Sequence, residues 1–337
     1  MAEKPPPMNL FVTGGAGYVG SHCVRALCDA GHGVVVLDNL SQGHRSAVDP
    51  RATFVEGDLS DTSLLRSLLS ADGVDGVMHF AAHLDVAESV RNPLKYYDNN
   101  VTNTIGLLTA MRDAGVKRLV FSSTCAIYGE PRSVPIAEEA AQAPINPYGH
   151  TKLAMEWAMR DSAEAWGLGG CALRYFNAAG AAADATIGED HNPETHLVPV
   201  VLQVALGRRE SVYVFGDDYP TPDGTCLRDY IHVEDLAAAH LRAIETQPIG
   251  LFRCYNVGTG RPASVREVIE AARCVTGHAI PVKITSRRPG DPAQLYADPT
   301  KIKAELNWSP RYTDIARIVE TAWAWHQDHP CGYGDGP

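Results

Sequence analysis

Residues 13–20 read Thr-Gly-Gly-Ala-Gly-Tyr-Val-Gly, and they follow the apolar run Asn-Leu-Phe-Val at 9–12. The next segment, 21–30, has a helical pattern, so the sequence predicts a buried strand, a tight turn and a helix in that order. The glycines of the loop are Gly14, Gly15, Gly17 and Gly20. The last three fit G-x-G-x-x-G, in which one glycine makes the turn, one admits a pyrophosphate and one lets the helix pack on the strand. The helix N-terminus then offers N–H groups to the phosphates, so a dinucleotide loop is predicted.

A carboxylate follows the next predicted strand. The apolar run 34–37 ends in Asp38, 18 residues after Gly20. An acid near this spacing accepts hydrogen bonds from the adenosine ribose hydroxyls, which favours NAD over NADP. The alternative interpretation is that Asp38 only caps a loop, and the spacing makes it the less favoured one.

The composition is that of an ordinary globular protein. The chain has 337 residues, 45% hydrophobic content and a formal net charge of −11. With this charge a nucleic-acid partner needs a concentrated basic face, and the notable basic clusters are only Arg208-Arg209 and Arg287-Arg288. These pairs are too short to indicate nucleic acid, but two arginines suit a small diphosphate.

No targeting segment, membrane span or metal site is predicted. Residues 1–8 are polar and lack the apolar core of a signal peptide, and no stretch approaches the length of a membrane span. The eight cysteines include no C-x-x-C pair and are best explained as buried free thiols in a reducing cytoplasm. His191 and His196 flank acidic residues, but their spacing matches no metal template, so they are expected to be loop residues.

Short apolar strands alternate with amphipathic helices further along the chain, as in 53–55, 64–69 and 76–80. This alternation predicts an α/β fold with a doubly wound parallel Rossmann sheet. Asp58 follows the strand at 53–55, where an acid is placed to reach an adenine amino group. A helix cap ahead of the next helix is an equally good interpretation of Asp58.

A polar strand end supplies a candidate substrate contact. The predicted strand 118–121 continues into Ser122-Ser123-Thr124. Ligands of such sheets collect at the carboxyl ends of strands, so Thr124 is a candidate, although threonines there are commonly turn formers.

Tyr148 and Lys152 lie four residues apart at the start of a predicted helix that runs to about Trp166, so they share one helix face. A free tyrosine hydroxyl has a pKa near ~10 and is a poor base at neutral pH. The neighbouring ammonium, together with the positive charge of nicotinamide, favours the phenolate. Tyr148 is therefore the candidate catalytic base.

Taken together, these motifs resemble the extended short-chain dehydrogenase/reductases, and most closely the UDP-glucose 4-epimerases. The resemblance covers nearly the whole chain. It is carried by TGGAGYVGSH (13–22), LDNLSQG (37–43), YYDNNV (96–101), FSSTCAIYGEP (121–131), PINPYGHTK (144–152), LRYFNAAGA (173–181), GRRESVYVFGDDYPTPDGTCLRDYIHVEDLA (207–237), YNVGTG (255–260) and RRPGD (287–291). The combination is far more specific than any one stretch.

The resemblance implies a tightly bound NAD and a UDP-sugar substrate, UDP-galactose or UDP-glucose. Besides the glycine loop, the residues it places against NAD are Tyr18, Val19, Asp38, Asn39, Asp58, Leu59, Phe80, Ala81, Asn99, Tyr148, Lys152 and Phe176. Those it places against the UDP-sugar are Thr124, Tyr148, Asn177, Leu197, Phe215, Arg228, Arg288, Asp291 and Leu295. Bidentate guanidinium groups suit a diphosphate independently of the resemblance.

The implied mechanism is a transient oxidation at C4 of the sugar. Tyr148 takes the proton of the 4-hydroxyl while the C4 hydride passes to NAD, and Thr124 holds the same oxygen. The keto sugar then swings about its link to the diphosphate and accepts the hydride on its other face. Lys152 holds the nicotinamide ribose and tunes Tyr148.

The second half of the chain is expected to form most of a smaller, intertwined substrate domain. Loops rich in proline and glycine interleave there with helices near 197–206, 233–245 and 264–275. The predicted division is a Rossmann domain at 8–180, with a returning segment near 230–260 that includes a strand at 251–257, and a UDP-sugar domain mainly at 181–330. The resemblance also implies a homodimer through helices at 94–114 and 148–166, whose apolar residues serve packing within one chain equally well.

Three positions depart from the best-known members of the family. Leu84 stands where many members have a lysine that contacts the cofactor. His196 lies in a segment that replaces an asparagine pair ahead of Leu197, so the resemblance assigns it no defined contact with the sugar. Leu295 aligns with a gatekeeper tyrosine that excludes N-acetyl sugars, and leucine is smaller, so activity on UDP-N-acetyl sugars is an open alternative. Stretches 123–131 and 287–291 also resemble UDP-arabinose 4-epimerases.

Two other functions of this fold predict different residues from those present. Sugar-nucleotide dehydratases and decarboxylases place an acid directly after the Thr or Ser, whereas this chain has Cys125 and Ala126. A non-catalytic NAD-sensing protein of the same fold predicts loss of Tyr148 or Lys152, and both are present. Epimerisation without elimination is therefore the preferred interpretation.

Overall fold

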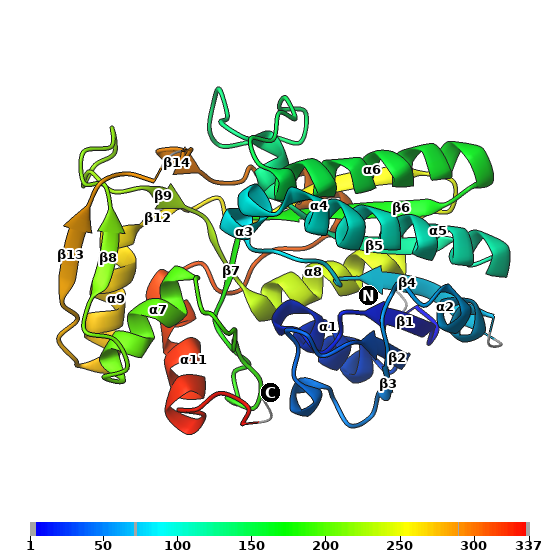
Figure 1. Ribbon diagram of the computed structural model, residues 1–337, viewed down its shortest axis with the longest axis horizontal. Coiled ribbons are helices and arrows are strands. Elements are labelled where there is room, and N and C mark those ends of the chain that lie inside the picture. Colours follow the sequence, from blue (N-terminus) through cyan, green and yellow to red (C-terminus); the bar gives the residue numbers. More distant parts are fainter. Residues whose placement is uncertain (1–4, 71–72, 289, 335–337) are drawn as a thin grey trace. The chain divides into compact units, whose positions relative to one another are not determined.

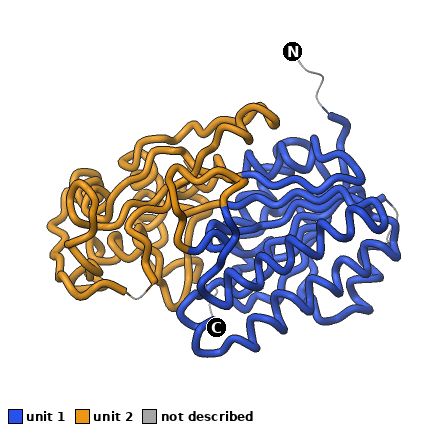
Figure 2. Tube along the Cα trace, turned by 90° about the horizontal axis from the view of Figure 1, so that it is seen from above, with its two compact units in different colours: residues 1–129, 141–174, 237–255 blue, residues 130–140, 175–236, 256–337 orange. Residues whose placement is uncertain are grey.

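The computed structural model describes residues 5–70, 73–288 and 290–334. The chain forms two compact units, coloured separately in Figure 2. Unit 1 comprises residues 1–129, 141–174 and 237–255, and unit 2 comprises residues 130–140, 175–236 and 256–337. This division differs from the expected one, because 130–140 and 175–180 belong to unit 2 and the returning segment begins at 237.

Unit 1 is built on a seven-stranded sheet with the order β11-β6-β5-β4-β1-β2-β3 (Figure 1). The strands are β1 (Asn9–Thr13), β2 (Gly33–Asp38), β3 (Thr53–Glu56), β4 (Val74–His79), β5 (Arg118–Thr124), β6 (Gly169–Tyr175) and β11 (Phe252–Val257). Strands β1 to β5 pair in parallel. The chain runs outward from β1 to β3 and then returns to β4 beside β1, which makes the switch point where such sheets bind ligands. The predicted doubly wound Rossmann sheet is confirmed, as is a strand at 251–257.

Helices cover both faces of this sheet (Figure 1). They are α1 (Tyr18–Ala30), α2 (Thr62–Leu69), α3 (Val86–Arg91), α4 (Pro93–Tyr96), α5 (Asn103–Ala114), α6 (Pro147–Trp166) and α8 (Val233–Thr246). A π-helical segment, η2 (Tyr97–Thr102), joins α4 to α5. The single helix expected at 94–114 is therefore wrong in one respect, since its middle is π-helical, a feature that is frequent at functional sites.

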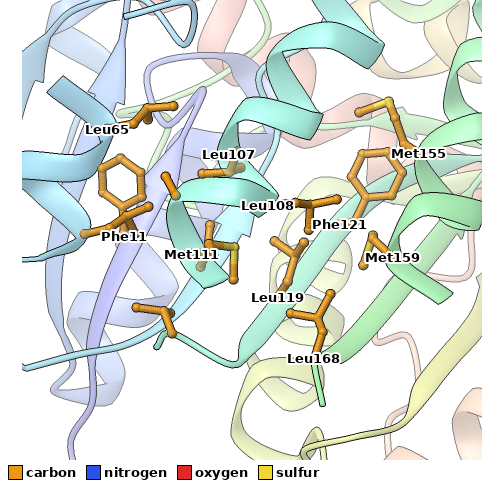
Figure 3. Close-up of a cluster of buried hydrophobic side chains, with 14 of the residues drawn as sticks. Phe11, Leu65, Leu107, Leu108, Met111, Leu119, Phe121, Met155, Met159 and Leu168 are labelled. Atoms are coloured by element: carbon orange, nitrogen blue, oxygen red, sulfur yellow. The ribbon is translucent and has the colours of Figure 1, made fainter. Parts of the chain in front are cut away.

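The main core of unit 1 lies between the sheet and helices α2, α5 and α6, as Figure 3 shows. Phe11, Leu119 and Phe121 point from the strands toward Leu107 and Met159 on the helices, and each is at most 1% exposed. Successive residues of a strand face opposite sides, so this apolar face fixes the orientation of β5. The same strand ends at Thr124, which the core thereby positions.

Unit 2 contains three small sheets and four complete helices among its described residues. Strand β7 (Asn177–Ala179) pairs with β10 (Tyr230–His232), and β8 (Val212–Phe215) pairs with β13 (Val282–Thr285). The third sheet has the order β12 (Ala263–Ser264), β9 (Leu227–Arg228) and β14 (Gln294–Leu295). The helices are α7 (Leu197–Ala205), α9 (Val265–Thr276), α10 (Thr300–Leu306) and α11 (Ile315–Asp328), and α7, α9 and α11 enclose an apolar core.

In the part of the chain that the structure describes, no helix combines the length and the apolar character needed to cross a membrane. All eight cysteines are free thiols. The expectation that they are buried is wrong for Cys274 and Cys331, which are exposed.

Candidate active site

The glycine loop joins β1 to α1, and its glycines are required for different reasons. Gly14 has a φ of 73°, and a Cβ there would lie 2.5 Å from the backbone nitrogen of Ala81. A Cβ on Gly20 would collide with the carbonyl oxygen of Gly14, so this glycine permits close packing of helix on loop. A Cβ on Gly17 would meet nothing closer than 3.5 Å. The space beside Gly17, at the N-cap of α1, is therefore a cradle that fits a pyrophosphate and that a side chain would fill.

Asp38 is the last residue of β2 and is largely buried. Its two carboxylate oxygens accept hydrogen bonds from the backbone N–H groups of Ala16, at 2.9 Å, and Leu40, at 2.9 Å. Burial raises the pKa of Asp38, although these backbone bonds oppose the shift. Asp38 thus orders both the glycine loop and the loop after β2. A carboxylate has about four lone-pair positions, so acceptor capacity remains for ribose hydroxyls.

Asp58 does not cap α2, because the N-cap is Asp61, whose side chain accepts from the backbone N–H of Leu64. Asp58 instead accepts from the Asn39 amide at 2.6 Å and from the hydroxyl and backbone N–H of Ser60. The hydrogen bond from the Ser60 hydroxyl is the main cause that lowers the pKa of Asp58. The helix-cap interpretation is therefore wrong, and the carboxylate instead connects Asn39 to Ser60.

A cavity of about 410 Å³ lies beside α2, η2 and α5. Three predicted cofactor residues, Asp58, Leu59 and Asn99, line it together with His83. Asn99 belongs to the π-helical segment, and its side-chain amide donates to the Asn100 side chain at 2.9 Å. The cavity offers carboxylate and amide groups beside Leu59, which suit the adenine end of a dinucleotide.

Further cofactor candidates lie after β4, at the start of α1 and in unit 2. Phe80 and Ala81 follow β4, and their backbone N–H groups donate to the Thr13 carbonyl oxygen at 2.9 and 3.2 Å, directly ahead of the glycine loop. Tyr18 and Val19 open α1. Phe176 is buried and belongs to unit 2. Unit 1 therefore holds every other residue that was predicted to line the cofactor.

Lys152 is buried on α6, with 2% of its surface exposed. Its ammonium donates to the Ser122 carbonyl oxygen at 2.8 Å and lies 5.8 Å from the centre of the Tyr148 ring. Burial lowers the pKa of Lys152 to about 7, and the carboxylate of Glu156 opposes this shift. The amine is therefore near its titration range at neutral pH, in reach of the phenol that it was predicted to tune.

Thr124 and Tyr148 lie on neighbouring elements. Thr124 ends β5, and its hydroxyl accepts from the Ala126 backbone N–H at 3.1 Å. At the start of α6, a Cβ on Gly149 would lie 2.8 Å from the Ala126 carbonyl oxygen, so the first turn of α6 packs on the turn after Thr124. The half-exposed Tyr148 belongs to the same first turn.

A buried ion pair behind this site was not predicted. The Arg174 guanidinium donates to both carboxylate oxygens of Glu156, at 3.0 and 2.6 Å, and also to the Tyr128 hydroxyl at 2.8 Å. Ser123 donates to the same carboxylate. The only local signal was the position of Glu156, four residues after Lys152 on the same helix face. The network ties α6 to β5 and β6 directly behind Lys152.

In unit 2, several predicted substrate residues gather around β9 and β14. Arg228 pairs in parallel register with Leu295, and its guanidinium donates to the Pro292 carbonyl oxygen at 2.9 Å and lies 3.5 Å from the Asp291 carboxylate. The Arg288 guanidinium stacks 3.7 Å above the Phe215 ring. The backbone N–H of Asp291 donates to the Arg288 carbonyl oxygen, so a hydrogen bond links the two residues.

The two other substrate candidates lie on different elements of unit 2. Asn177 begins β7, and its backbone N–H donates to the Asp229 carbonyl oxygen, next to Arg228. Leu197 is the first residue of α7 and packs against the apolar core. Leu84, one of the three departures, is 42% exposed in unit 1.

Comparison with known proteins identifies the family. The model of the NAD dependent epimerase/dehydratase family matches residues 10–258. The chain belongs to this family. It is 53% identical to the UDP-glucose 4-epimerase of Lacticaseibacillus casei, over 97% of this chain and 99% of that protein. It is 51% identical to the enzyme of the same name from Corynebacterium glutamicum, over 94% and 95%. The resemblance to UDP-glucose 4-epimerases is confirmed.

Solved structures of family members have the same fold and contain the expected cofactor. A UDP-glucose 4-epimerase from Brucella ovis in complex with NAD has a TM-score of 0.90 and 48% identity, covering 94% of this chain and 97% of that one. The epimerase from Stenotrophomonas maltophila, with bound NAD and formylated UDP-arabinopyranose, has a TM-score of 0.92 and 42% identity, covering 96% and 99%. The cradle at Gly17 and the acceptors at Asp38 and Asp58 fit this cofactor in the present chain.

The buried ion pair generates a stability prediction. Glu156→Ala leaves the Arg174 guanidinium buried without its carboxylate, so we expect the free energy of unfolding to fall by about 3–5 kcal/mol. Asp113→Ala is the matched control, because it removes a carboxylate from exposed pairs with Arg112 and Arg66, and is expected to cost less than about 1 kcal/mol. Urea unfolding of both variants at equal cofactor content measures the difference. Equal losses would show that the buried network has no special role in stability.

Proposed function

We propose that this protein is a UDP-glucose 4-epimerase that interconverts UDP-galactose and UDP-glucose through transient oxidation at C4, with NAD tightly bound. The observation that carries the proposal is the position of Tyr148 and Lys152 on one face of α6, beside the strand end that bears Thr124. When bound, NAD supplies the hydride acceptor and later the hydride donor. The residues of the chain bind and orient the substrate and the cofactor, and they move the proton.

Tyr148 is the proposed base for the sugar 4-hydroxyl. A protonated Lys152, held 5.8 Å from the Tyr148 ring centre, stabilises the phenolate and so lowers the pKa of the phenol toward neutrality. In turn the phenolate favours the ammonium form of Lys152. Burial in a site of low dielectric strengthens this coupling, because water screens it little. Thr124 holds the oxygen that loses and regains the proton.

The second stage requires the keto sugar to present its other face. Arg228 and Arg288 of unit 2 are the proposed diphosphate ligands, and they keep the UDP part fixed while the sugar turns about its link to the diphosphate. Arg228 is held by the Pro292 carbonyl oxygen and the Asp291 carboxylate, and Arg288 by the Phe215 ring. Both guanidinium groups are thus oriented before substrate arrives, which reduces the entropy lost on binding.

The turn after Thr124 also argues against elimination chemistry. Cys125 is buried there and Ala126 contributes only its backbone N–H to Thr124. Neither residue offers the acid that a dehydratase needs at C5. The proposed product is therefore the 4-epimer alone.

The central test is to incubate purified protein, without added cofactor, with UDP-galactose, UDP-N-acetylgalactosamine and UDP-arabinose separately and to resolve the products by chromatography. Conversion to the 4-epimer is expected at least with UDP-galactose. Tyr148→Phe keeps the ring and removes the base, so it should lower kcat by about 10²–10⁴-fold.

Lys152→Met tests whether the Lys152 ammonium lowers the pKa of Tyr148. Without the ammonium the pKa of Tyr148 rises, so the acid limb of the pH–rate profile should move to higher pH by about one unit or more. An unchanged profile would contradict the role of Lys152.

If no sugar nucleotide is converted even after NAD is supplied, the epimerase proposal fails and an NAD-sensing protein becomes the better explanation.

Leu295 generates a specificity prediction. It lies on β14 opposite Arg228, and leucine leaves more room than the tyrosine found in many relatives. We expect Leu295→Tyr to lower kcat/KM for UDP-N-acetylgalactosamine by about 10-fold or more and to change that for UDP-galactose by no more than about threefold. Equal effects on both substrates would mean that Leu295 does not face the sugar 2-substituent.

We also propose that the protein is a cytoplasmic homodimer. The eight free thiols suit a reducing compartment. Large apolar side chains are exposed on α3, α4, η2, α5 and α6 of unit 1, among them Val90 (62%), Leu94 (77%), Ile105 (46%) and Trp157 (51%). Exposed apolar residues concentrated on packed helices indicate a protein interface, and a second copy of the same helices is the proposed partner.

Sedimentation velocity tests the dimer. The unmodified protein should sediment as a dimer, and Leu94→Glu or Trp157→Glu should convert it to a monomer, since a buried unpaired carboxylate is costly. Ile249→Glu is the control, because Ile249 is also 51% exposed in unit 1 but lies outside these helices. A monomeric unmodified protein would contradict the proposal.

A further inference from the structure

Four potential metal ligands meet in unit 2, on the segment between β7 and α7. Glu189, His191, Glu194 and His196 each present one ligand atom, and all four atoms lie within 4.8 Å of one another. The sequence pattern is Glu-x-His-x-x-Glu-x-His. Neither histidine nor either glutamate has a part in the proposed epimerisation mechanism. The cluster therefore needs an explanation of its own.

The two distances from His191 match the ligand shell of a small tetrahedral ion, and the two from His196 are shorter, in the range of hydrogen bonds. The His191 Nδ1 lies 3.3 Å from a Glu189 oxygen and 3.5 Å from a Glu194 oxygen, and the His196 Nδ1 lies 2.9 and 3.1 Å from the same two carboxylates. Zn²⁺ binds such ligands at about 2.0–2.2 Å, so tetrahedral geometry separates neighbouring ligand atoms by about 3.3–3.6 Å. Each imidazole contacts both carboxylates, as ligands around one centre do.

Burial and charge also favour a cation. The side chains of Glu189 and Glu194 are only 5% and 3% exposed. With neutral imidazoles the cluster carries two negative charges, and buried charges of like sign must be compensated. Two protons or one divalent cation supply the same compensation. Imidazole nitrogen and carboxylate oxygen together are ligands that Zn²⁺ accepts well.

The protein holds the carboxylates in place by other bonds. One carboxylate oxygen of Glu194 accepts hydrogen bonds from the backbone N–H groups of Thr195 and His196, both at 2.7 Å. The backbone carbonyl oxygen of Glu194 accepts a hydrogen bond from the Arg209 guanidinium. Near Glu189, the Tyr333 hydroxyl lies 2.9 Å from the Gly188 nitrogen and 3.1 Å from its oxygen. Glu194 and the backbone beside Glu189 are thus held by bonds other than the contacts between imidazole and carboxylate, a feature that built metal sites share.

The segment that carries the cluster is long for a loop. Residues 180–196 contain no helix or strand, and loops of this length without secondary structure are uncommon unless they serve a function. His196 is the N-cap residue of α7, so the cluster lies directly ahead of that helix.

We propose that Glu189, His191, Glu194 and His196 bind one structural Zn²⁺ ion, which pins segment 180–196 and sets the start of α7. Four protein ligands close the shell, so the ion stabilises the fold and takes no part in the reaction. This proposal departs from the expectation that these histidines are ordinary loop residues outside any metal site. The proposal does not depend on the proposed epimerase activity.

Metal content is the first test. Protein without a metal-binding tag is dialysed against Zn²⁺ and then against metal-free buffer, and zinc is measured by mass spectrometry. We expect about one zinc per chain. His191→Asn/His196→Asn should lose it, and Glu194→Gln, which preserves side-chain volume, should bind it much more weakly. His278→Asn, an exposed histidine elsewhere in unit 2, should retain it.

Two further readouts do not depend on activity. Co²⁺ in place of Zn²⁺ should give the intense visible absorption of a tetrahedral site, absent from the double variant. Removal of zinc by EDTA should lower Tm by about 2–6 °C in the unmodified protein but not in the double variant. Absence of zinc from the unmodified protein, or equal zinc in the double variant, would overturn the proposal and assign the cluster to protonated histidines.

Discussion

The placement of the Lys152 ammonium inside unit 1 is the constraint on which the proposed site depends. A buried ammonium is costly unless it donates hydrogen bonds, and here the Ser122 carbonyl oxygen, at the end of β5, accepts one. The Phe121 ring lies 4.8 Å from the nitrogen on the same strand. β5 must therefore end in this position against α6 for the charge to be tolerated. Thr124, two residues after Ser122, is placed by the same requirement.

Three residues at intervals of four along α6 differ in how deeply they are buried. Tyr148 is half-exposed, Lys152 is buried, and Glu156 is fully enclosed with Arg174. The Glu156 carboxylate acts on Lys152 against the effect of burial, which keeps the pKa of the amine near neutrality and not far below it. The Glu156–Arg174 ion pair therefore does more than connect α6 to the sheet. Its carboxylate also raises the pKa of the amine beside the proposed base.

The sequence predicted those features whose signal is local. The glycine loop, Asp38 at the end of β2 and the tyrosine–lysine pair at the start of α6 all occur at spacings that one strand–loop–helix unit or one helix face determines. Asp58 and Asp61 show the limit, because both precede α2 and only the structure shows which one accepts from a helical N–H group.

Features that join distant segments gave no such signal. Glu156 and Arg174 lie on α6 and β6, and no motif connects them before the strands are assembled. The assignment of 130–140 to unit 2 rests on contacts of the same kind, such as the bridge between Ile136 and Ala297 and the bond from the Asn256 backbone N–H to Glu138. The cluster at 189–196 is close in sequence, but an irregular loop has no periodicity from which the positions of its side chains follow.

Buried carboxylates organise unit 2, where the paired strands are short. Asp229 is fully buried and accepts from the backbone N–H groups of Thr259, Gly260 and Ala297, while Asp235 accepts from those of Arg311 and Tyr312. In a large sheet, backbone N–H groups donate to the neighbouring strand. In these loops the carboxylates accept the hydrogen bonds of backbone N–H groups instead. Glu189 and Glu194 differ from them because each also contacts two imidazoles, in addition to the backbone N–H groups that Glu194 accepts from. A backbone N–H cannot give way to a cation, whereas an imidazole becomes a metal ligand as soon as it loses its proton.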